Sequence, residues 1–161
     1  MKPYRESHTN EALIEAPIER VWALHTNPDE MRAAFSRFLE VGVVAGQPGT
    51  VGCIVRATMR TPTGKVGTAD SEILAVDPPR SMTTRTTVHG APKVGMESTR
   101  LLAREVNRTR ATLVTTAVTV PVSWLARTVL RMTKARRARE AALLFGIETA
   151  EENAYFARTT S

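Results

Sequence analysis

The stretch Ile14–Leu24, with the sequence IEAPIERVWAL, marks the point where the chain changes from a strand to a helix. Residues 7–15 are compatible with a first strand whose end is apolar, and Pro17 interrupts that pattern. Proline suits the first turn of a helix, because the N–H that it lacks has no partner there. Side chains at helical spacing then predict a short helix over residues 17–25: Ile18, Val21, Trp22 and His25.

A second short helix is predicted directly after the first. Asn27 can cap its first turn, Pro28 suits the first helical position, and the acidic residues that follow complement the positive end of the helix dipole. The apolar face of this helix is expected to consist of Met31, Ala34, Phe35 and Phe38.

The chain from residue 38 to about residue 120 has the pattern of strands joined by short turns. Val51–Arg60 alternates apolar and polar side chains, and glycine, proline and asparagine separate the segments. Consecutive strands with short connections predict an antiparallel meander. The expected strands are residues 41–44, 51–60, 66–76, 81–89, 94–106 and 109–120.

The part of the chain after Pro121 has a helical composition and contains no further proline. The basic segment 134–139 carries no large apolar side chain, so the apolar face is interrupted over residues 133–140. We therefore expect two helical segments, each with an apolar stripe. The stripes are Val122, Leu125, Val129 and Met132, and then Leu143, Leu144, Ile147, Ala150 and Ala154.

Composition favours one globular domain over residues 1–161. The chain is 42% hydrophobic and 24% charged, which suffices for a core, and no apolar run approaches the roughly 20 residues that span a bilayer. The polar N-terminus shows no secretory signal, and the one cysteine, Cys53, fits a reducing compartment, so a cytoplasmic location is expected. A single thiol also excludes zinc sites built from several cysteines.

Motifs along nearly the whole chain match one known pattern. They are residues 14–24, Asn27–Glu30, Gly49–Gly52, the turn Val76–Arg80, Thr109–Thr112 at the last strand and Leu143–Glu151 in the closing helix. With these motifs the chain resembles the START-like, helix-grip superfamily (SRPBCC), and within it the polyketide cyclase/dehydrase and lipid-transport group. The resemblance implies an α+β helix-grip fold. A curved antiparallel sheet of about seven strands, with two short helices after strand 1, would wrap around a long C-terminal helix.

A cavity between the sheet and the helix follows from this resemblance, because one helix does not fill a strongly curved sheet. An apolar interior with few polar groups is a usual ligand site, and only 5% of the residues are aromatic and able to fill it. The alternative is that leucines and methionines of the helix occupy the space, with Trp22 closing the core. The expected lining is Trp22, Phe35, Cys53, Val55, Ala57, Met59, Ile73, Met82, Thr84, Val114, Thr116, Leu125 and Val129.

No catalytic residues are assigned, because no catalytic constellation is evident. The expected function is binding or carriage of a small hydrophobic ligand of the lipid, polyketide or isoprenoid class, without a cofactor. The alternative is a cyclase or dehydratase that acts on such a ligand, with His25, Arg56 and Asp70 as the first suspects for acid–base work. No ligand spacing in the sequence predicts a metal site.

Two further groups, a pair of carboxylates and the cysteine, are expected to have no catalytic role. Asp70 and Glu72 share a strand face that is expected to be solvated, where Arg100 and Arg104 could pair with them across the sheet. Cys53 is expected to be a small buried hydrophobe, because no neighbouring base is evident that would activate its thiol.

The chain is basic, with a formal net charge of +6, and many of its cations cluster in the C-terminal part. A solvated helix face balanced by later glutamates is one interpretation of this cluster, and contact with an anionic surface is the other. No aromatic residues interleave it, so nucleic acid is not an expected partner. Peripheral membrane contact, and a monomer or a homodimer, are compatible with the sequence. The cluster consists of Arg127, Arg131, Lys134, Arg136, Arg137 and Arg139.

Overall fold

The structure, a computed structural model, describes residues 3–61, 63–91, 94–121 and 123–160. Within this part, the chain forms seven strands and four helices. In chain order they are β1 (Pro3–Ile14), α1 (Ile18–Thr26), α2 (Pro28–Ala34), β2 (Phe38–Ala45), β3 (Ile54–Arg60), β4 (Val66–Asp77), β5 (Ser81–Val88), β6 (Val94–Glu105), β7 (Arg108–Pro121), α3 (Trp124–Met132) and α4 (Lys134–Thr159).

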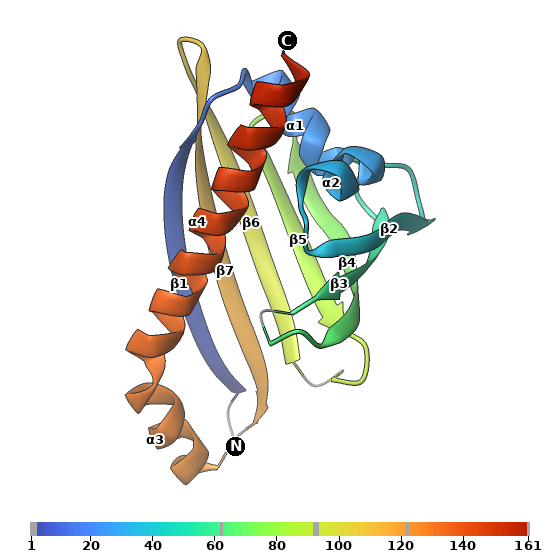
Figure 1. Ribbon diagram of the computed structural model, residues 1–161. Coiled ribbons are helices and arrows are strands. Elements are labelled where there is room, and N and C mark those ends of the chain that lie inside the picture. The colour runs from blue at the N-terminus through green and yellow to red at the C-terminus, as the bar shows by residue number, and fades with distance from the viewer. Residues whose placement is uncertain (1–2, 62, 92–93, 122, 161) are drawn as a thin grey trace.

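The seven described strands form one antiparallel sheet in the order β1-β7-β6-β5-β4-β3-β2. Strands β2 to β6 each pair with the next strand in the chain, and β1 pairs with β7. The long helix α4 runs across one face of the sheet beside β1, with α1 and α2 near one end of the molecule and α3 at the other (Figure 1). The expected helix-grip architecture is therefore confirmed.

Local chemistry accounts for the two short helices. Pro17 precedes the first residue of α1, and Pro28 occupies the first turn of α2. The side-chain oxygen of Asn27 accepts hydrogen bonds from the backbone N–H groups of Asp29 and Glu30, at 3.0 and 3.4 Å. The predicted cap of α2 is thus confirmed, and it satisfies two donors that have no partner within the helix.

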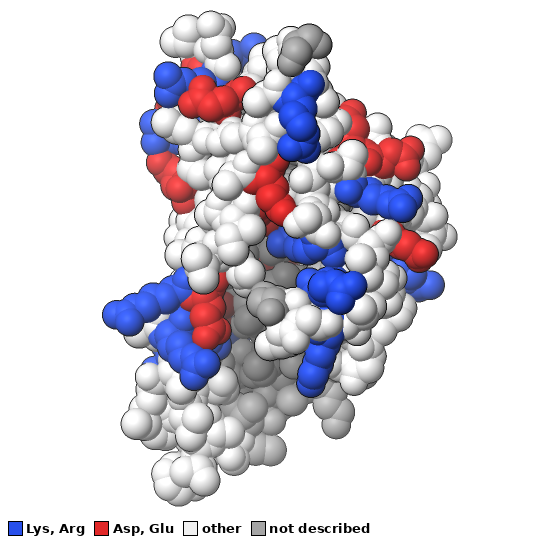
Figure 2. Space-filling model, viewed as in Figure 1, with Lys and Arg blue, Asp and Glu red and all other residues white. Residues whose placement is uncertain are grey.

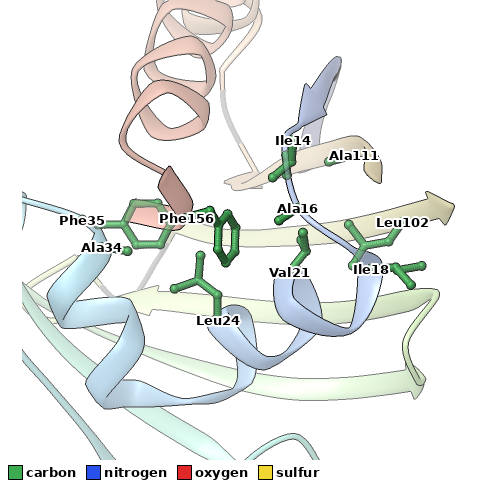
Figure 3. Close-up of a cluster of buried hydrophobic side chains, with 10 residues drawn as sticks. All are labelled: Ile14, Ala16, Ile18, Val21, Leu24, Ala34, Phe35, Leu102, Ala111 and Phe156. Carbon is green, nitrogen blue, oxygen red and sulfur yellow. The ribbon is translucent and has the colours of Figure 1, made fainter. Parts of the chain in front are cut away.

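The main hydrophobic cluster lies at one end of the sheet, where α1 and α2 meet the C-terminal part of α4. Figure 3 shows the ring of Phe156 beside Leu24 and Phe35, all of which are essentially inaccessible to solvent. The cluster consists of Ile14, Ala16, Ile18, Val21, Leu24, Ala34, Phe35, Leu102, Ala111 and Phe156. Since this cluster is displaced toward one end, the middle of the sheet and the middle of α4 lie outside it.

The C-terminal helices differ from the expectation in two respects. Two segments are present, but they divide at Thr133, and the basic residues 134–139 belong to α4. The helix α4 buries Phe145, Glu152 and Phe156 rather than the predicted stripe, because it is turned by its contacts with β1 and α2. The exposed members of the two predicted stripes are Leu125, Val129, Met132, Leu143, Leu144, Ile147, Ala150 and Ala154, and Val122 lies outside the described residues.

The position of the core predicts the effect of truncating Leu24. Replacement Leu24→Ala should lower the free energy of unfolding by about 3 kcal/mol, because it opens a cavity in a fully buried site. Urea unfolding followed by circular dichroism measures the change. The control Leu143→Ala truncates a leucine that is 65% exposed and should cost less than about 0.5 kcal/mol. Equal losses in the two variants would contradict this position of the core.

Candidate functional site

Two ion pairs between the strands and α4 show which face of the sheet points toward α4. We call this face of the sheet the inner face. Arg100 of β6 donates from Nη2 to Glu148 Oε1 of α4 at 2.7 Å. Glu6 of β1 accepts from Nε of Arg137, also on α4, at 3.0 Å. Residues directly opposite each other on antiparallel strands have their side chains on the same face of the sheet, and the two faces alternate along each strand. The strand register therefore shows which residues lie on the inner face and which on the outer face.

The middle of the inner face is lined by hydroxyl groups and small side chains. Thr84, Ser98 and Thr115 face one another across β5, β6 and β7, and Ser71 is paired with Thr86 on β4 and β5. The hydroxyls bond to one another, at 2.8 Å between Ser71 and Thr86 and at 3.4 Å between Ser98 and Thr115. All five side chains are half-buried, so α4 does not cover this area completely.

The part of α4 between its two ion pairs packs unevenly against the rest of the fold, because Phe145 is buried there whereas Leu144 is not. Arg137, Ala141, Leu144 and Glu148 follow one another at spacings of four, three and four residues, so they lie on one side of the helix. Leu144 nevertheless remains 41% exposed, although the ion pairs on both sides of it turn this side toward the sheet. Figure 2 shows basic side chains on the surface beside the helix.

A cluster of charged groups, the Glu148 cluster (Arg37, Arg100 and Glu148), joins α4 to the sheet. Arg37 reaches Glu148 at 3.0 Å and stacks over the ring of Phe38, with the guanidinium carbon 4.9 Å from the ring centre. Burial alone would raise the pKa of Glu148, but the positive charges of Arg100 and Arg37 outweigh it and lower the pKa to about 2. Among the described atoms, the buried Arg37 Nε has no hydrogen-bond partner.

Beside this cluster, a histidine and a glutamate form a buried pair. His25 Nε2 lies 3.0 Å from Glu152 Oε1, and their side chains are 7% and 1% exposed. The ring of His25 also lies 6.0 Å from that of Phe35. Of the three suspects for acid–base chemistry, His25 is thus the one that lies inside the fold. It has a carboxylate partner that could orient its ring.

The other two suspects pair with each other on the outer face. Arg56 Nε donates to Asp70 Oδ1 at 2.8 Å, and His89 lies 3.1 Å from the same carboxylate. The hydrogen bonds from Arg56 and His89 hold the pKa of Asp70 well below its usual range. The expected cross-sheet pairing with Arg100 and Arg104 was wrong, because Arg100 points inward to Glu148 and Arg104 pairs with Glu19.

A second charged cluster, the Glu6 cluster, lies toward the start of α4. Glu6 accepts hydrogen bonds from Arg137 and from the Tyr4 hydroxyl, and His8 lies 2.7 Å from the carboxylate. The hydrogen bond from Arg137 overcomes the opposing effect of burial and lowers the pKa of Glu6 to about 2. Arg137, which the sequence grouped with the basic surface cluster, is therefore turned inward and paired.

The remaining predicted lining residues divide into three groups. Those on the inner face are Cys53, Ala57 and Ile73, which are buried, and Val55, Met59, Met82 and Thr84, which are half-buried. Trp22 and Phe35 belong to or pack against the hydrophobic cluster. Those that do not face the inner space are Val114 and Thr116, which the register assigns to the outer face, and Leu125 and Val129, which are exposed on α3.

Cys53 matches its expected character. It is a free and fully buried cysteine, and burial raises the pKa of its thiol. In the described part of the chain, no group of His, Cys, Asp and Glu side chains could hold a metal ion. No described helix is long and apolar enough to cross a membrane.

The curved sheet and the helix across it define a START-like, helix-grip protein. Residues 5–143 match the family model described as polyketide cyclase / dehydrase and lipid transport, so the chain belongs to that family. The resemblance stated from the sequence motifs is thereby confirmed. No curated protein matches the chain significantly.

Solved structures share this fold at low sequence identity. A protein of unknown function from Staphylococcus aureus matches with a TM-score of 0.78 at 12% identity, over 99% of this chain and 98% of that chain. Ara h 8.0201 matches with a TM-score of 0.66 at 13% identity, over 96% and 99%. Major latex-like protein 151 from Panax ginseng has a TM-score of 0.64 at 15% identity, over 85% and 96%. At these identities the likeness shows the fold alone.

The lowered pKa of Glu148 predicts how the stability depends on pH. A carboxylate whose pKa falls from 4.5 to about 2 on folding stabilises the fold above pH 4.5, and this contribution is lost as the pH falls toward 2. Glu148→Gln should therefore lower the free energy of unfolding by about 3 kcal/mol at pH 7. The difference from the wild type should shrink between pH 4.5 and 2, as measured by urea unfolding.

The control for this variant is Glu140→Gln, which removes an exposed partner of Arg136 on the same helix. It should change the free energy of unfolding by less than about 0.5 kcal/mol at any pH. A difference between the wild type and Glu148→Gln that stays constant from pH 7 to pH 2 would contradict the ionised, buried state of Glu148.

Proposed function

We propose that this protein binds and carries a small hydrophobic ligand, of the lipid, polyketide or isoprenoid class, between α4 and the inner face of the sheet. The observation that carries this function is the exposure of Leu144. It is 41% exposed on the side of α4 that two ion-pair clusters turn toward the sheet. A tightly packed helix would bury such a leucine, so the space beside it can accept an apolar guest.

The lining of this space supports an amphipathic ligand. Met82 and Val55 supply apolar surface, whereas Ser98 and Thr115 supply hydroxyl groups that can donate or accept. At one end lies the Glu148 cluster, where Arg37 Nε has no partner among the described atoms. An oxygen of the ligand there would satisfy this donor and fix the orientation of the ligand, as a few polar groups do in apolar sites.

The family and the composition support the rest of this assignment. The family description includes both cyclases or dehydrases and lipid transport, and the chain is expected to act as one domain over residues 1–161. A buried, unpaired Cys53 is compatible with a reducing cytoplasm. Native mass spectrometry of the purified protein would report the bound mass and, in the same spectrum, a monomer or a homodimer.

A second candidate function is a cyclase or dehydratase, which the buried His25–Glu152 pair favours. A histidine held by a carboxylate can take up or release a proton on a bound ligand. It lies next to the Glu148 cluster, where the positive charges of Arg37 and Arg100 could stabilise an enolate oxygen. Carriage remains the first proposal because His25 and Glu152 are bonded to each other and need not react.

Filling the space beside Leu144 should weaken ligand binding. Leu144→Trp places a large ring toward the sheet and should raise the dissociation constant of an apolar probe, 8-anilinonaphthalene-1-sulfonate, about tenfold or more. Leu143→Trp adds the same ring on the adjacent, 65% exposed position and should leave binding unchanged. Fluorescence titration measures both variants. Equal dissociation constants for Leu144→Trp and the wild type would place the probe elsewhere and contradict the proposed site.

Carriage and catalysis differ in what happens to the bound molecule. A carrier should release the molecule with its mass unchanged after long incubation, both in the wild type and in His25→Asn, as measured by mass spectrometry of extracted ligand. Circular dichroism checks that His25→Asn is folded. Conversion by the wild type that is lost in folded His25→Asn would overturn carriage in favour of the enzyme.

A further inference from the structure

The short helix α3 presents an apolar face to solvent. Trp124 and Met132 are 79% and 80% exposed, and Leu125 and Val129 are 59% and 53% exposed. Their positions fall within about 140° of the helix circumference, so they form one continuous face. Such a contiguous exposed apolar face commonly marks an interaction surface.

The opposite side of α3 is attached to the rest of the fold. Ala126 and Leu130 are half-buried, and the Leu130 carbonyl accepts a hydrogen bond from the guanidinium of Arg137. Arg137 in turn pairs with Glu6 of β1, so α3 is held in place through the Glu6 cluster. The side chain of Ser123 accepts from the Ala126 N–H and caps the helix. The apolar face is therefore exposed by a folded, capped helix.

Basic side chains border this face. Arg127 and Arg131 line a shallow hollow of about 330 Å³ together with Trp124 and Thr128. Further cations follow at the start of α4, and Figure 2 shows basic side chains gathered there. The first acidic residue after Pro121 is Glu140, which Arg136 engages at 2.9 Å. This end of the molecule therefore combines an apolar face with a positive border.

We propose that α3 docks the protein on an anionic phospholipid surface, with the side chains of Trp124, Leu125, Val129 and Met132 inserted among the acyl chains. An interfacial helix needs an apolar face, an aromatic residue near the headgroups and basic residues that meet lipid phosphates. On α3 these are the exposed face, Trp124, and the pair Arg127 and Arg131. This docking goes beyond ligand binding and does not depend on it.

The basic border of this apolar face favours an anionic membrane as its partner over a second copy of the chain or a nucleic acid. In a symmetric pair of copies the same patch faces itself, and α3 contains no acidic residue, so arginines of one copy would lie near arginines of the other. Nucleic acid would use the cations but would leave Leu125 and Met132 in water. An anionic lipid surface satisfies both the charge and the apolar area.

The position of α3 at one end of the molecule is compatible with docking through its apolar face. It lies at the end of the molecule opposite the β6–β7 turn, with the start of α4 next to it (Figure 1). Docking through α3 therefore brings the start of α4 to the lipid surface and leaves the main hydrophobic cluster at the far end. A ligand that moves between a bilayer and the space beside α4 would have a short path.

Tryptophan fluorescence tests the docking directly. The chain contains two tryptophans, so Trp22→Phe leaves Trp124 as the single reporter. Vesicles of phosphatidylcholine with phosphatidylglycerol should shift its emission to the blue, and brominated acyl chains should quench it. Pure phosphatidylcholine vesicles should bind at least about tenfold more weakly, and added salt should weaken binding to the anionic vesicles.

Matched variants separate the apolar face from the charges, with vesicle co-sedimentation as the assay. Trp124→Ser combined with Met132→Ser should abolish binding, whereas Val51→Ser with Val106→Ser, at positions 61% and 97% exposed, should bind normally. Arg127→Glu with Arg131→Glu should weaken binding at least about tenfold. The equally charged control, Arg108→Glu with Arg158→Glu, changes exposed arginines outside α3 and should bind more tightly than that variant.

Three results would contradict this docking. The first is that the protein does not bind anionic vesicles at low salt, and the second is that the α3 variants bind them as well as their controls do. The third is that α3 mediates self-association or nucleic-acid binding while the protein does not bind vesicles. Probe titration in the absence of vesicles should be unchanged in the folded α3 variants. Loss of vesicle binding and loss of ligand binding can therefore be told apart, and each function can fail alone.

Discussion

The position of the long helix α4 depends on the ion pairs that the carboxylate of Glu148 forms. This carboxylate lies between the guanidinium groups of Arg100, on β6, and Arg37, in the segment between α2 and β2. A buried carboxylate is costly unless nearby charges compensate it. The helix is therefore held at the rotation at which both arginines reach Glu148. The pair of Glu6 and Arg137 holds its first turns in the same rotation.

This polar attachment and the displaced hydrophobic cluster have a joint consequence. Phe156 packs α4 against α1 and α2 at one end, and Arg137 joins it to β1 toward the other. In the segment between these attachments Phe145 is buried, whereas Ala141 is half-buried and Leu144 is exposed. The helix is thus held near its ends and at Phe145, and one flank of its middle part is not packed. This arrangement leaves room for a guest without loss of the fold.

Much of the fold could be predicted because its signals are local. Asn27 and Pro28 mark the start of α2, and the turns between strands mark the meander. The face of β7 could not be predicted, because Leu113 and Val114 are neighbouring apolar residues in a threonine-rich strand without clear alternation. The register assigns Leu113 to the inner face opposite Arg100, and Val114 to the outer face.

The charged residues of the site could not be predicted from the sequence either. Glu148 and Glu152 are four residues apart on a helix, a spacing that is equally common on solvated faces. Their partners Arg100 and His25 are distant in the chain, so no short-range pattern connects them. His25 could be named as a titratable suspect, but its burial beside Glu152 depends on the packing of α1 against α4.

By itself, the sequence determined the order of the elements, the helix caps and the family, because these depend on neighbouring residues and short motifs. Only the tertiary structure decided which side of the C-terminal helices faces the sheet. That choice depends on ion pairs between segments far apart in the chain, from Glu6 to Arg137 and from Arg37 and Arg100 to Glu148. The same ion pairs leave Leu144 exposed beside the sheet and hold α3 with Trp124 in solvent.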